Sequence, residues 1–229
     1  MFIFVSDVHL DKPQSKRYGA FLRLLDEIKE DESIKEFFLV GDIFDLWVGD
    51  RSAFIQKHKV VLEKIRKIAK LKKVHYFEGN HDFQLGVLWK DMGVEVYPDE
   101  HEFNLKGQRV LVSHGDLLDQ SDKNYLRMRW FFRTPFARFL IKILPEVLLV
   151  KIGSLLSTTE HKELPTKEEQ RAFQENWEKW TRELHSKKPY DVFICGHFHF
   201  NADLMLPDLD SRAVNLGTWL NGEFSVFEL

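Results

Sequence analysis

Five short apolar segments of this chain each end in carboxylate, amide or imidazole side chains. The sequence has ten histidines, and five of them occupy these positions. In open α/β sheets the carboxyl ends of strands line the ligand crevice, so such segments are expected to converge on one site. The segments and the side chains after them are "FIFVS" with Asp7 and His9, "FFLVG" with Asp42 and then Asp45, "VHYFEG" with Asn80 and His81, "VLVS" with His114 and Asp116, and "DVFICG" with His197 and His199.

The apolar segments alternate with stretches of helical periodicity. Residues 18–30 and 53–71 carry apolar side chains at helical spacing, and we expect one helix in each. Strands separated by helices predict a mainly parallel sheet with crossover connections. The strand-like segments 202–206, 212–217 and 223–229 predict a second sheet or a sheet edge. The predicted strands before them are residues 1–6, 36–40, 74–77, 109–114 and 191–195.

Composition narrows the class of protein. With 229 residues the chain is long enough for one large domain, and we expect a single domain over 1–229. A net charge of −3 argues against a nucleic-acid partner, and a single cysteine, Cys195, excludes a disulfide framework. The first residues, "MFIFVSD", lack the basic start of a signal peptide, and no apolar run reaches the ~18 residues of a spanning helix. A cytoplasmic location is expected, with a peripheral membrane role left open.

The donor set at the five segments predicts a metal centre. Two carboxylates, one amide and four imidazoles suit divalent first-row metals, and the lack of thiolates argues against a zinc finger or an iron–sulfur centre. Seven ligands are too many for one catalytic ion, whereas two ions about 3.5–4 Å apart that share a carboxylate would use them all. Taken alone, each pair has a structural interpretation, and "GNHD" by itself favours a turn. The predicted ligands are Asp7, His9, Asp42, Asn80, His114, His197 and His199.

The order D-x-H, G-D, G-N-H-D, H-G, G-H-x-H resembles that of the calcineurin-like metallophosphoesterases over nearly the whole chain. The resemblance implies an α/β fold in which a β-sandwich of two sheets is flanked by helices. It also implies that His81 is a catalytic residue beside the substrate phosphate. One metal would then be held by Asp7, His9, Asp42 and His199, and the other by Asp42, Asn80, His114 and His197, with Asp42 bridging.

Such a site predicts hydrolysis of a phosphoester or a phosphoanhydride. Two cations lower the pKa of a bridging water and supply hydroxide near neutral pH for in-line attack on phosphorus. They also neutralise the phosphoryl oxygens, so that an anionic nucleophile can approach. No Walker-type phosphate loop occurs in the sequence.

The segment at about 119–185 is predicted to be an inserted helical lid. Between Lys123 and Lys151 there are seven Lys or Arg residues and a single acid, Glu146. Within residues 135–156 helical spacing groups five apolar residues, and Pro145 is expected to divide this stretch into two helices. The segment has two interpretations: a helical pair that packs into the core, or a lid with an apolar face for acyl chains that also suits an anionic membrane surface. The five apolar residues are Phe136, Phe139, Leu140, Ile143 and Leu144.

A narrower resemblance is to the UDP-2,3-diacylglucosamine hydrolases of lipid A biosynthesis. It rests on "GDIFDLWVGD", on "HGD" followed by Asp122, Tyr125 and Arg129, on the helical insertion, and on "NLGTW". It implies attack on the α-phosphorus of UDP-2,3-diacylglucosamine to give UMP and 2,3-diacylglucosamine 1-phosphate, with two divalent ions, most often Mn²⁺. It also implies a peripheral place on the cytoplasmic face of the inner membrane. The implied substrate contacts are Asn80, His81, Asp122, Tyr125 and Arg129.

The chain departs from that family at two positions. The family commonly reads G-N-R-D-F where this chain has His81, and G-H-T-H-R-P where it has "GHFHFN". These departures leave open another nucleotide-linked lipid or sugar as the substrate. A phosphoesterase for a cyclic nucleotide, phosphoprotein or nucleic acid is a rival interpretation. A non-catalytic scaffold, as in a retromer-like subunit, is a further one, but all seven ligands are present. The metal identity, acyl chain length and oligomeric state are not predicted.

Overall fold

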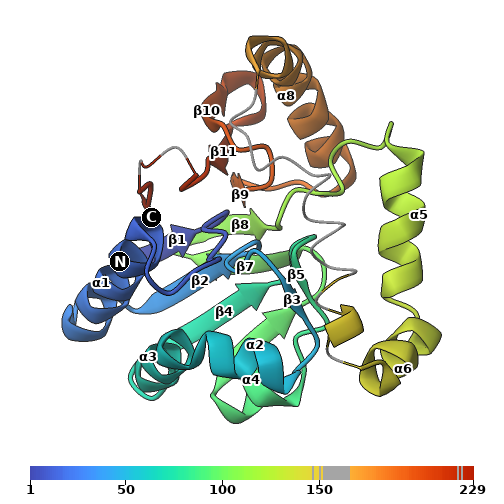
Figure 1. The fold of residues 1–229 in the computed structure, drawn as a ribbon. Coiled ribbons are helices and arrows are strands. Elements are labelled where there is room, and N and C mark those ends of the chain that lie inside the picture. The colour runs from blue at the N-terminus through green and yellow to red at the C-terminus, as the bar shows by residue number, and fades with distance from the viewer. Residues whose placement is uncertain (146, 150, 152–165, 221, 223) are drawn as a thin grey trace.

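Two five-stranded sheets packed face to face form the centre of the protein in a computed structural model (Figure 1). The structure describes residues 1–145, 147–149, 151, 166–220, 222 and 224–229. The first sheet has the order β12-β1-β2-β4-β6, in which β1, β2, β4 and β6 are parallel neighbours and β12 is antiparallel at the edge. Its strands are β1 (Phe2–Val5), β2 (Glu36–Val40), β4 (Lys73–Phe77), β6 (Val94–Tyr97) and β12 (Phe227–Glu228).

The second sheet has the order β10-β11-β9-β8-β7. Its three central strands are parallel, and an antiparallel strand lies at each edge. A small parallel pair, β3 (Trp47–Val48) and β5 (Asp82–Phe83), stands apart from both sheets in the pairing. The strands of the second sheet are β7 (His101–Leu105), β8 (Gln108–Val112), β9 (Val192–Cys195), β10 (Asn201–Leu206) and β11 (Ser211–Leu216).

Alternating side chains of the two sheets make the layers. Phe4, Phe38 and Phe77 of the first sheet face Val112 and Ile194 of the second in one buried cluster. The alternate residues of each strand point to the outer face of its sheet and are apolar as well. Helices cover these outer faces and bury the apolar side chains. The predicted sandwich of two sheets with helices outside is therefore confirmed, and the late strand-like segments do extend the second sheet and edge the first.

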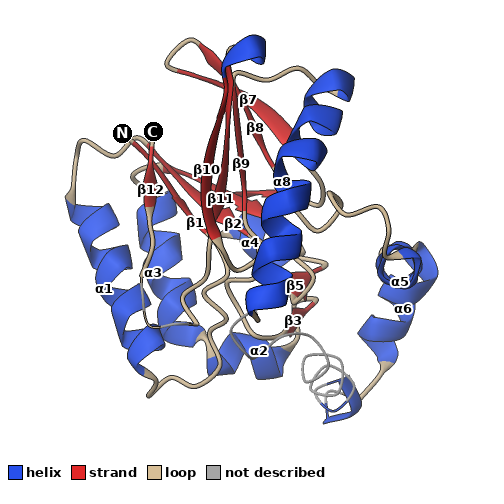
Figure 2. Ribbon diagram, turned by 90° about the horizontal axis from the view of Figure 1, so that it is seen from above, coloured by secondary structure: helices blue, strands red, loops and turns tan. Residues whose placement is uncertain are grey.

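Most of the helices lie on the outer faces of the sheets (Figures 1 and 2). Ser15 caps the first of them by accepting a hydrogen bond from the Tyr18 N–H. The helices on the first sheet bury their apolar faces in the same cluster as its outer side chains. The elements are α1 (Lys16–Glu30), α2 (Ser52–Lys57), α3 (Lys59–Ala69), α4 (Val87–Asp91), α5 (Lys123–Phe132), α6 (Pro135–Ile143), α8 (Lys167–Lys187) and the short η1 (Pro207–Leu209).

The single helix predicted over 53–71 is wrong. The chain forms two helices, α2 and α3, that meet at His58, whose φ of −110° and ψ of 18° are not helical. The His58 ring is fully buried and stacks on Tyr18, with ring centroids 6.0 Å apart, and also packs on Phe44. Turning this ring inward redirects the chain, so that Phe54 of α2 and the apolar face of α3 both reach the core.

The range predicted as a lid contains two different parts. In α8, Phe173 and Trp177 pack against the outer face of the second sheet, so this helix forms a layer of the sandwich. In contrast, α5 and α6 stand beside the sheets (Figure 2). The α6 helix ends at Ile143, just before Pro145, as predicted. Residues 146, 150 and 152–165, which the lid prediction includes, lie outside the described residues.

Candidate metal centre

The seven predicted ligands all follow strands whose carboxyl ends meet at one end of the sandwich. Asp7 and His9 come after β1, Asp42 after β2 and Asn80 after β4. From the second sheet, β8 leads to His114, and β9 leads to the segment with the other two histidines, 197 and 199. The site is therefore built where parallel strands of both sheets end together, as expected for a crevice of this kind.

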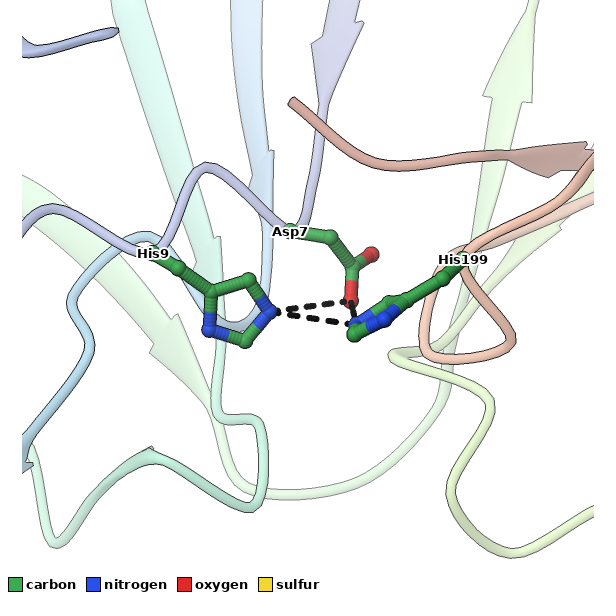
Figure 3. A group of neighbouring side chains, drawn as sticks. All are labelled: Asp7, His9 and His199. Carbon is green, nitrogen blue, oxygen red and sulfur yellow. Dashed lines mark hydrogen bonds and ion pairs between the residues drawn. The ribbon is translucent and has the colours of Figure 1, made fainter. Parts of the chain in front are cut away.

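Three of these side chains form a first group (Figure 3). The Nε2 atoms of His9 and His199 lie 3.1 Å apart. The Oδ1 atom of Asp7 is 3.3 Å from the His199 Nε2 and 3.8 Å from the His9 Nε2. Donor atoms bound to one first-row ion at about 2.1 Å are separated by about 3 Å or more, so these three atoms could share an ion.

Asn80, His114 and His197 form a second group. The Asn80 Oδ1 is 3.0 Å from the His114 Nε2 and 3.1 Å from the His197 Nδ1. The other ring nitrogen of His114 donates to the Val40 carbonyl at 3.0 Å, which directs the Nε2 atom toward the site.

Asp42 lies between the two groups. Its Oδ2 atom is 3.5 Å from the His114 Nε2 and 3.9 Å from the His9 Nε2. Its Oδ1 atom accepts a hydrogen bond from the His81 backbone N–H at 2.9 Å. One carboxylate thus borders both groups, which is the arrangement that a bridging ligand needs.

The backbone at the site is strained. Five of the seven residues have positive φ, a region that side chains other than Gly rarely adopt. Each such residue costs on the order of 1 kcal/mol or more and persists only where surrounding contacts impose it, as at functional sites. The φ values are 49° for Asp7, 48° for His9, 53° for Asp42, 75° for His197 and 58° for His199.

Glycines beside the ligands let the loops approach closely. A Cβ atom on Gly79 would lie 2.1 Å from the Asp42 Oδ1, and one on Gly196 would lie 2.2 Å from the Asp7 Oδ2. These distances are far below contact, so any other residue would push the carboxylates away. The glycines of the G-N and G-H motifs are therefore required by the packing of one ligand loop on another.

Asp82 holds the loops together, a role that the sequence did not reveal. Its buried carboxylate accepts hydrogen bonds from the backbone N–H groups of Asp42, at 2.8 Å, and Gly79, at 3.0 Å, and from the Tyr76 hydroxyl at 2.6 Å. Burial, reinforced by the nearby Asp42 carboxylate, raises the pKa of Asp82 to about 7. The turn that "GNHD" favours is thus present, and it also positions the Asn80 and Asp42 side chains.

The charges at the site favour a bound cation. Burial alone would raise the pKa of Asp7, but hydrogen bonding to His199 and His9 outweighs it and lowers that pKa well below its usual value. Burial and the nearby His114 lower the pKa of His197 to about 4. The Asp7 Oδ1 atom is buried, and its nearest donors, the ring nitrogens of His199 and His9 at 3.3 and 3.8 Å, do not reach it in good hydrogen-bond geometry, which is costly for a carboxylate oxygen. The residues therefore fit divalent ions, which would satisfy this oxygen.

His81 lies beside the first group. Its Nδ1 atom is 3.0 Å from the Asp45 carbonyl oxygen, and its ring meets the His9 ring edge to face with centroids 4.9 Å apart. One ligand atom each from His9, Asp45 and His81 also lie within 4.8 Å of one another. The ring is therefore next to the predicted metal pair.

The other predicted substrate contacts lie at different places. Arg129 donates from Nε to the Asp116 Oδ2 at 2.6 Å, and the Tyr125 hydroxyl donates to the same oxygen. The Tyr125 ring also lies near the ring of His197, with centroids 6.2 Å apart, so this pair borders the second group. Asp122 is exposed and caps α5 by accepting from the Tyr125 N–H at 2.9 Å. The organising role of Asp116 was missed, although its place in "HGD" was a signal.

Comparison with known proteins identifies the family. The model of the calcineurin-like phosphoesterases matches residues 1–201. The chain therefore belongs to the calcineurin-like phosphoesterase family, as the order of its motifs predicted.

Several relatives that align with this chain share one name. A UDP-2,3-diacylglucosamine hydrolase from Psychromonas ingrahamii is 32% identical over 154 residues, which cover 66% of this chain and 62% of that relative. One from Photorhabdus laumondii is 29% identical over 95% of this chain and 90% of its own length. A solved archaeal phosphodiesterase superposes with a TM-score of 0.50 at 15% identity, covering 96% of this chain and 85% of that one, which shows the shared fold.

Proposed function

We propose that this protein is a dinuclear metal-dependent phosphohydrolase that cleaves the pyrophosphate bond of UDP-2,3-diacylglucosamine to UMP and 2,3-diacylglucosamine 1-phosphate. The observation that carries the proposal is the position of Asp42, whose Oδ2 borders both ligand groups. The name shared by relatives that align over most of the chain supports the substrate.

The seven grouped side chains would hold two divalent ions, which we propose are Mn²⁺. Asp7, His9 and His199 would bind one, Asn80, His114 and His197 the other, and Asp42 both. When bound, the ions would activate water and offset the negative charge of the phosphoryl oxygens. Asp82 would keep the ligand loops in place, because its carboxylate accepts hydrogen bonds from the loops after both β2 and β4.

An apolar surface on α5 and α6 supports a lipid substrate. Ala137 and Ile141 form the buried side of α6, whereas Phe136, Phe139 and Ile143 are 61%, 59% and 58% exposed. These three residues do not belong to the core, which removes the interpretation of a core-packing helix for them. Large contiguous apolar surfaces of this kind mark binding sites. Further exposed apolar residues nearby are Trp130, Phe131, Val147 and Leu148.

The two helices are tied to the body at their ends. Arg51 donates to the carbonyls of Lys142, at 2.6 Å, and Leu144, at 2.9 Å. Arg133 pairs with the buried Glu78, which follows β4. These contacts join the two helices to the segments after β3 and β4, and we propose that their apolar surface receives acyl chains.

We also propose that this surface rests on the cytoplasmic face of the inner membrane. Arg138 and Lys142 are exposed on α6 beside the apolar residues, and such helices bind anionic lipid surfaces. Among the described helices, none combines the length and the apolar character that crossing a membrane requires.

The direct test is UMP release from UDP-2,3-diacylglucosamine with Mn²⁺. We expect turnover that is lost when a chelator removes the ions and restored when Mn²⁺ is added back, because the ions would activate the attacking water. Phosphate-ester activity on a soluble diester, with no turnover of the lipid pyrophosphate, would contradict the proposed substrate but not the metal centre.

Placing charged residues on the exposed apolar face of α6 tests whether this face binds acyl chains. Aspartate at Phe136, Phe139 and Ile143 together is expected to weaken turnover of the long-chain substrate at least about 100-fold, because each fully buried apolar side chain contributes roughly 1.5–3 kcal/mol to binding. Turnover of a short soluble phosphodiester should be unchanged. Loss of both activities with loss of the thermal transition would show instead that these residues support the fold. Triple replacement by serine, which adds no charge, separates lost contact from membrane repulsion.

A further inference from the structure

A second candidate subsite lies next to the ligand histidines, on α8. It is a cavity of about 540 Å³, a volume in the range of small-molecule sites. Its wall is formed by the loop 118–121, one side of α8 and the segment from His197 to Phe200. Because His197 and His199 belong to this wall, a group attached to a phosphoryl at the metal centre could extend into the cavity. Among the described residues that line it, none comes from α5 or α6.

Aromatic rings make up much of the wall. Phe198 stacks on Trp180, with ring centroids 5.2 Å apart and planes at 21°, and Phe200 stacks on Phe173 at 5.1 Å and 27°. Phe198 and Phe200 alternate in sequence with the two ligand histidines, so one segment supplies both metal ligands and aromatic wall. Stacked aromatic walls favour a further flat ring as ligand.

Polar groups line the rest of the cavity and argue against an acyl chain. Asp119, Ser121, Asn176 and Lys179 all contribute to the wall. Hydrocarbon against these groups would remove them from water without giving them hydrogen bonds. A nucleoside, with a flat ring and several hydrogen-bonding atoms, matches both kinds of wall.

The neighbouring cavity is a poorer match. It is smaller, about 240 Å³, and it reaches His114 and Asp116 instead. Its wall carries five carboxylates and three basic side chains, whereas the wall of the larger cavity carries two carboxylates, Asp119 and Glu183, and one basic side chain, Lys179. Of the two, the larger cavity therefore has the better volume and fewer acidic groups to repel a phosphorylated ligand.

We infer that the cavity between α8 and the segment 197–200 holds the nucleoside half of the substrate, with its base against the rings of Trp180, Phe198 and Phe200. This inference rests on the proposed function and extends it, because it places the nucleotide and the acyl chains on separate surfaces around one metal centre. It also gives the departure "GHFHFN" a role in binding the base, where the resembled hydrolases have threonine and arginine.

Binding of three ligands to the Mn²⁺-loaded full chain tests the inference. Calorimetry should show UMP binding at least about fivefold more tightly than ribose 5-phosphate, since base stacking on an aromatic side chain contributes at least that much. Inorganic phosphate reports on the metal centre alone. If ribose 5-phosphate binds as tightly as UMP, the base is not held and the inference is overturned.

Two variants locate the base. Trp180→Leu removes a ring from the wall, and Ala172→Leu narrows the cavity from an exposed position on α8 without removing a core contact. Both variants should weaken the binding of UMP at least about fivefold and leave the affinity for inorganic phosphate within about twofold of that of the unchanged protein. Glu175→Leu adds the same side chain at an exposed position of the same helix outside the cavity, and should change neither. If the variants weaken the binding of UMP and of phosphate by the same factor, the cavity residues support the structure and do not bind the base.

The outcomes also separate the inference from the proposed function. Suppose that the protein hydrolyses UDP-2,3-diacylglucosamine but that neither cavity variant changes its affinity for UMP. This result would overturn the inference and leave the proposed function standing. Cavity-dependent UMP binding without hydrolysis of the lipid pyrophosphate would overturn the proposed substrate and support the nucleotide subsite.

Discussion

Replacing Asp42 with asparagine is expected to lower phosphohydrolase activity at least about 10³-fold. The loss of the shared negative charge should remove several kcal/mol of transition-state stabilisation, since the Asp42 Oδ2 lies 3.5 Å from the His114 Nε2 and 3.9 Å from the His9 Nε2. Metal analysis should show about two ions per chain in the unchanged protein and fewer in the variant.

Asparagine is a better probe here than alanine. Residue 42 has a φ of 53°, which Asn tolerates and Ala does not, so Asp42→Ala would add backbone strain of about 1–2 kcal/mol. Asn also keeps an oxygen that can accept from the His81 N–H. Asp208→Asn, at an exposed carboxylate paired with Arg182, is a matched control and should keep both activity and metal content. Full activity of Asp42→Asn, or one ion in the unchanged protein, would overturn the dinuclear centre.

The buried strands could be predicted from the sequence because each of them is a short run of apolar residues. Residues 36–40 read "EFFLV", and β2 has these bounds in the structure. In contrast, β7 (His101–Leu105) carries exposed polar residues at the sheet edge, and only its pairing with β8 makes it a strand. Edge strands of this kind lack a pattern of their own.

Tertiary packing decided what periodicity could not. The helical pattern over 53–71 continues through His58, yet the buried ring of that residue divides the segment into α2 and α3. Likewise the helical character of 167–187 was included in the lid range, while contacts of Phe173 and Trp177 place α8 on the second sheet. Both outcomes depend on tertiary contacts, namely the burial of the His58 ring in the core and the packing of α8 on the second sheet, and the local sequence does not determine them.

The candidate site was predictable in part for a topological reason. Residues after parallel strands must meet at one edge, and the structure brings all seven predicted side chains together there. Residues that support the site from outside carried no such signal. Asp82 accepts hydrogen bonds from the backbone of Asp42, 40 residues away in the chain, and Asp116 accepts one from Arg129, 13 residues away, and no periodicity of the sequence predicts either contact.

His81 is one of the two positions at which this chain departs from the hydrolases it resembles, and its surroundings define two alternative tasks. Its Nδ1 faces the Asp45 carbonyl at 3.0 Å, so this nitrogen carries the proton and Nε2 is the atom that can exchange one. A protonated ring could give a proton to the leaving oxygen. It could also place positive charge beside the phosphoryl group, as an arginine would.

We expect His81→Ala to lower kcat about 10²–10⁴-fold with both metals still bound, which is the usual contribution of a general acid. His81→Arg separates the two tasks, because arginine stays protonated and cannot serve as the acid. Recovery of much of the activity on UDP-2,3-diacylglucosamine with arginine would assign charge stabilisation, and no recovery beyond that of alanine would assign acid catalysis. His101→Ala, at an exposed histidine on β7, is the control and should keep the original kcat. A normal kcat for His81→Ala would reject both tasks and leave His81 as a turn residue, whose backbone N–H holds the Asp42 carboxylate in place.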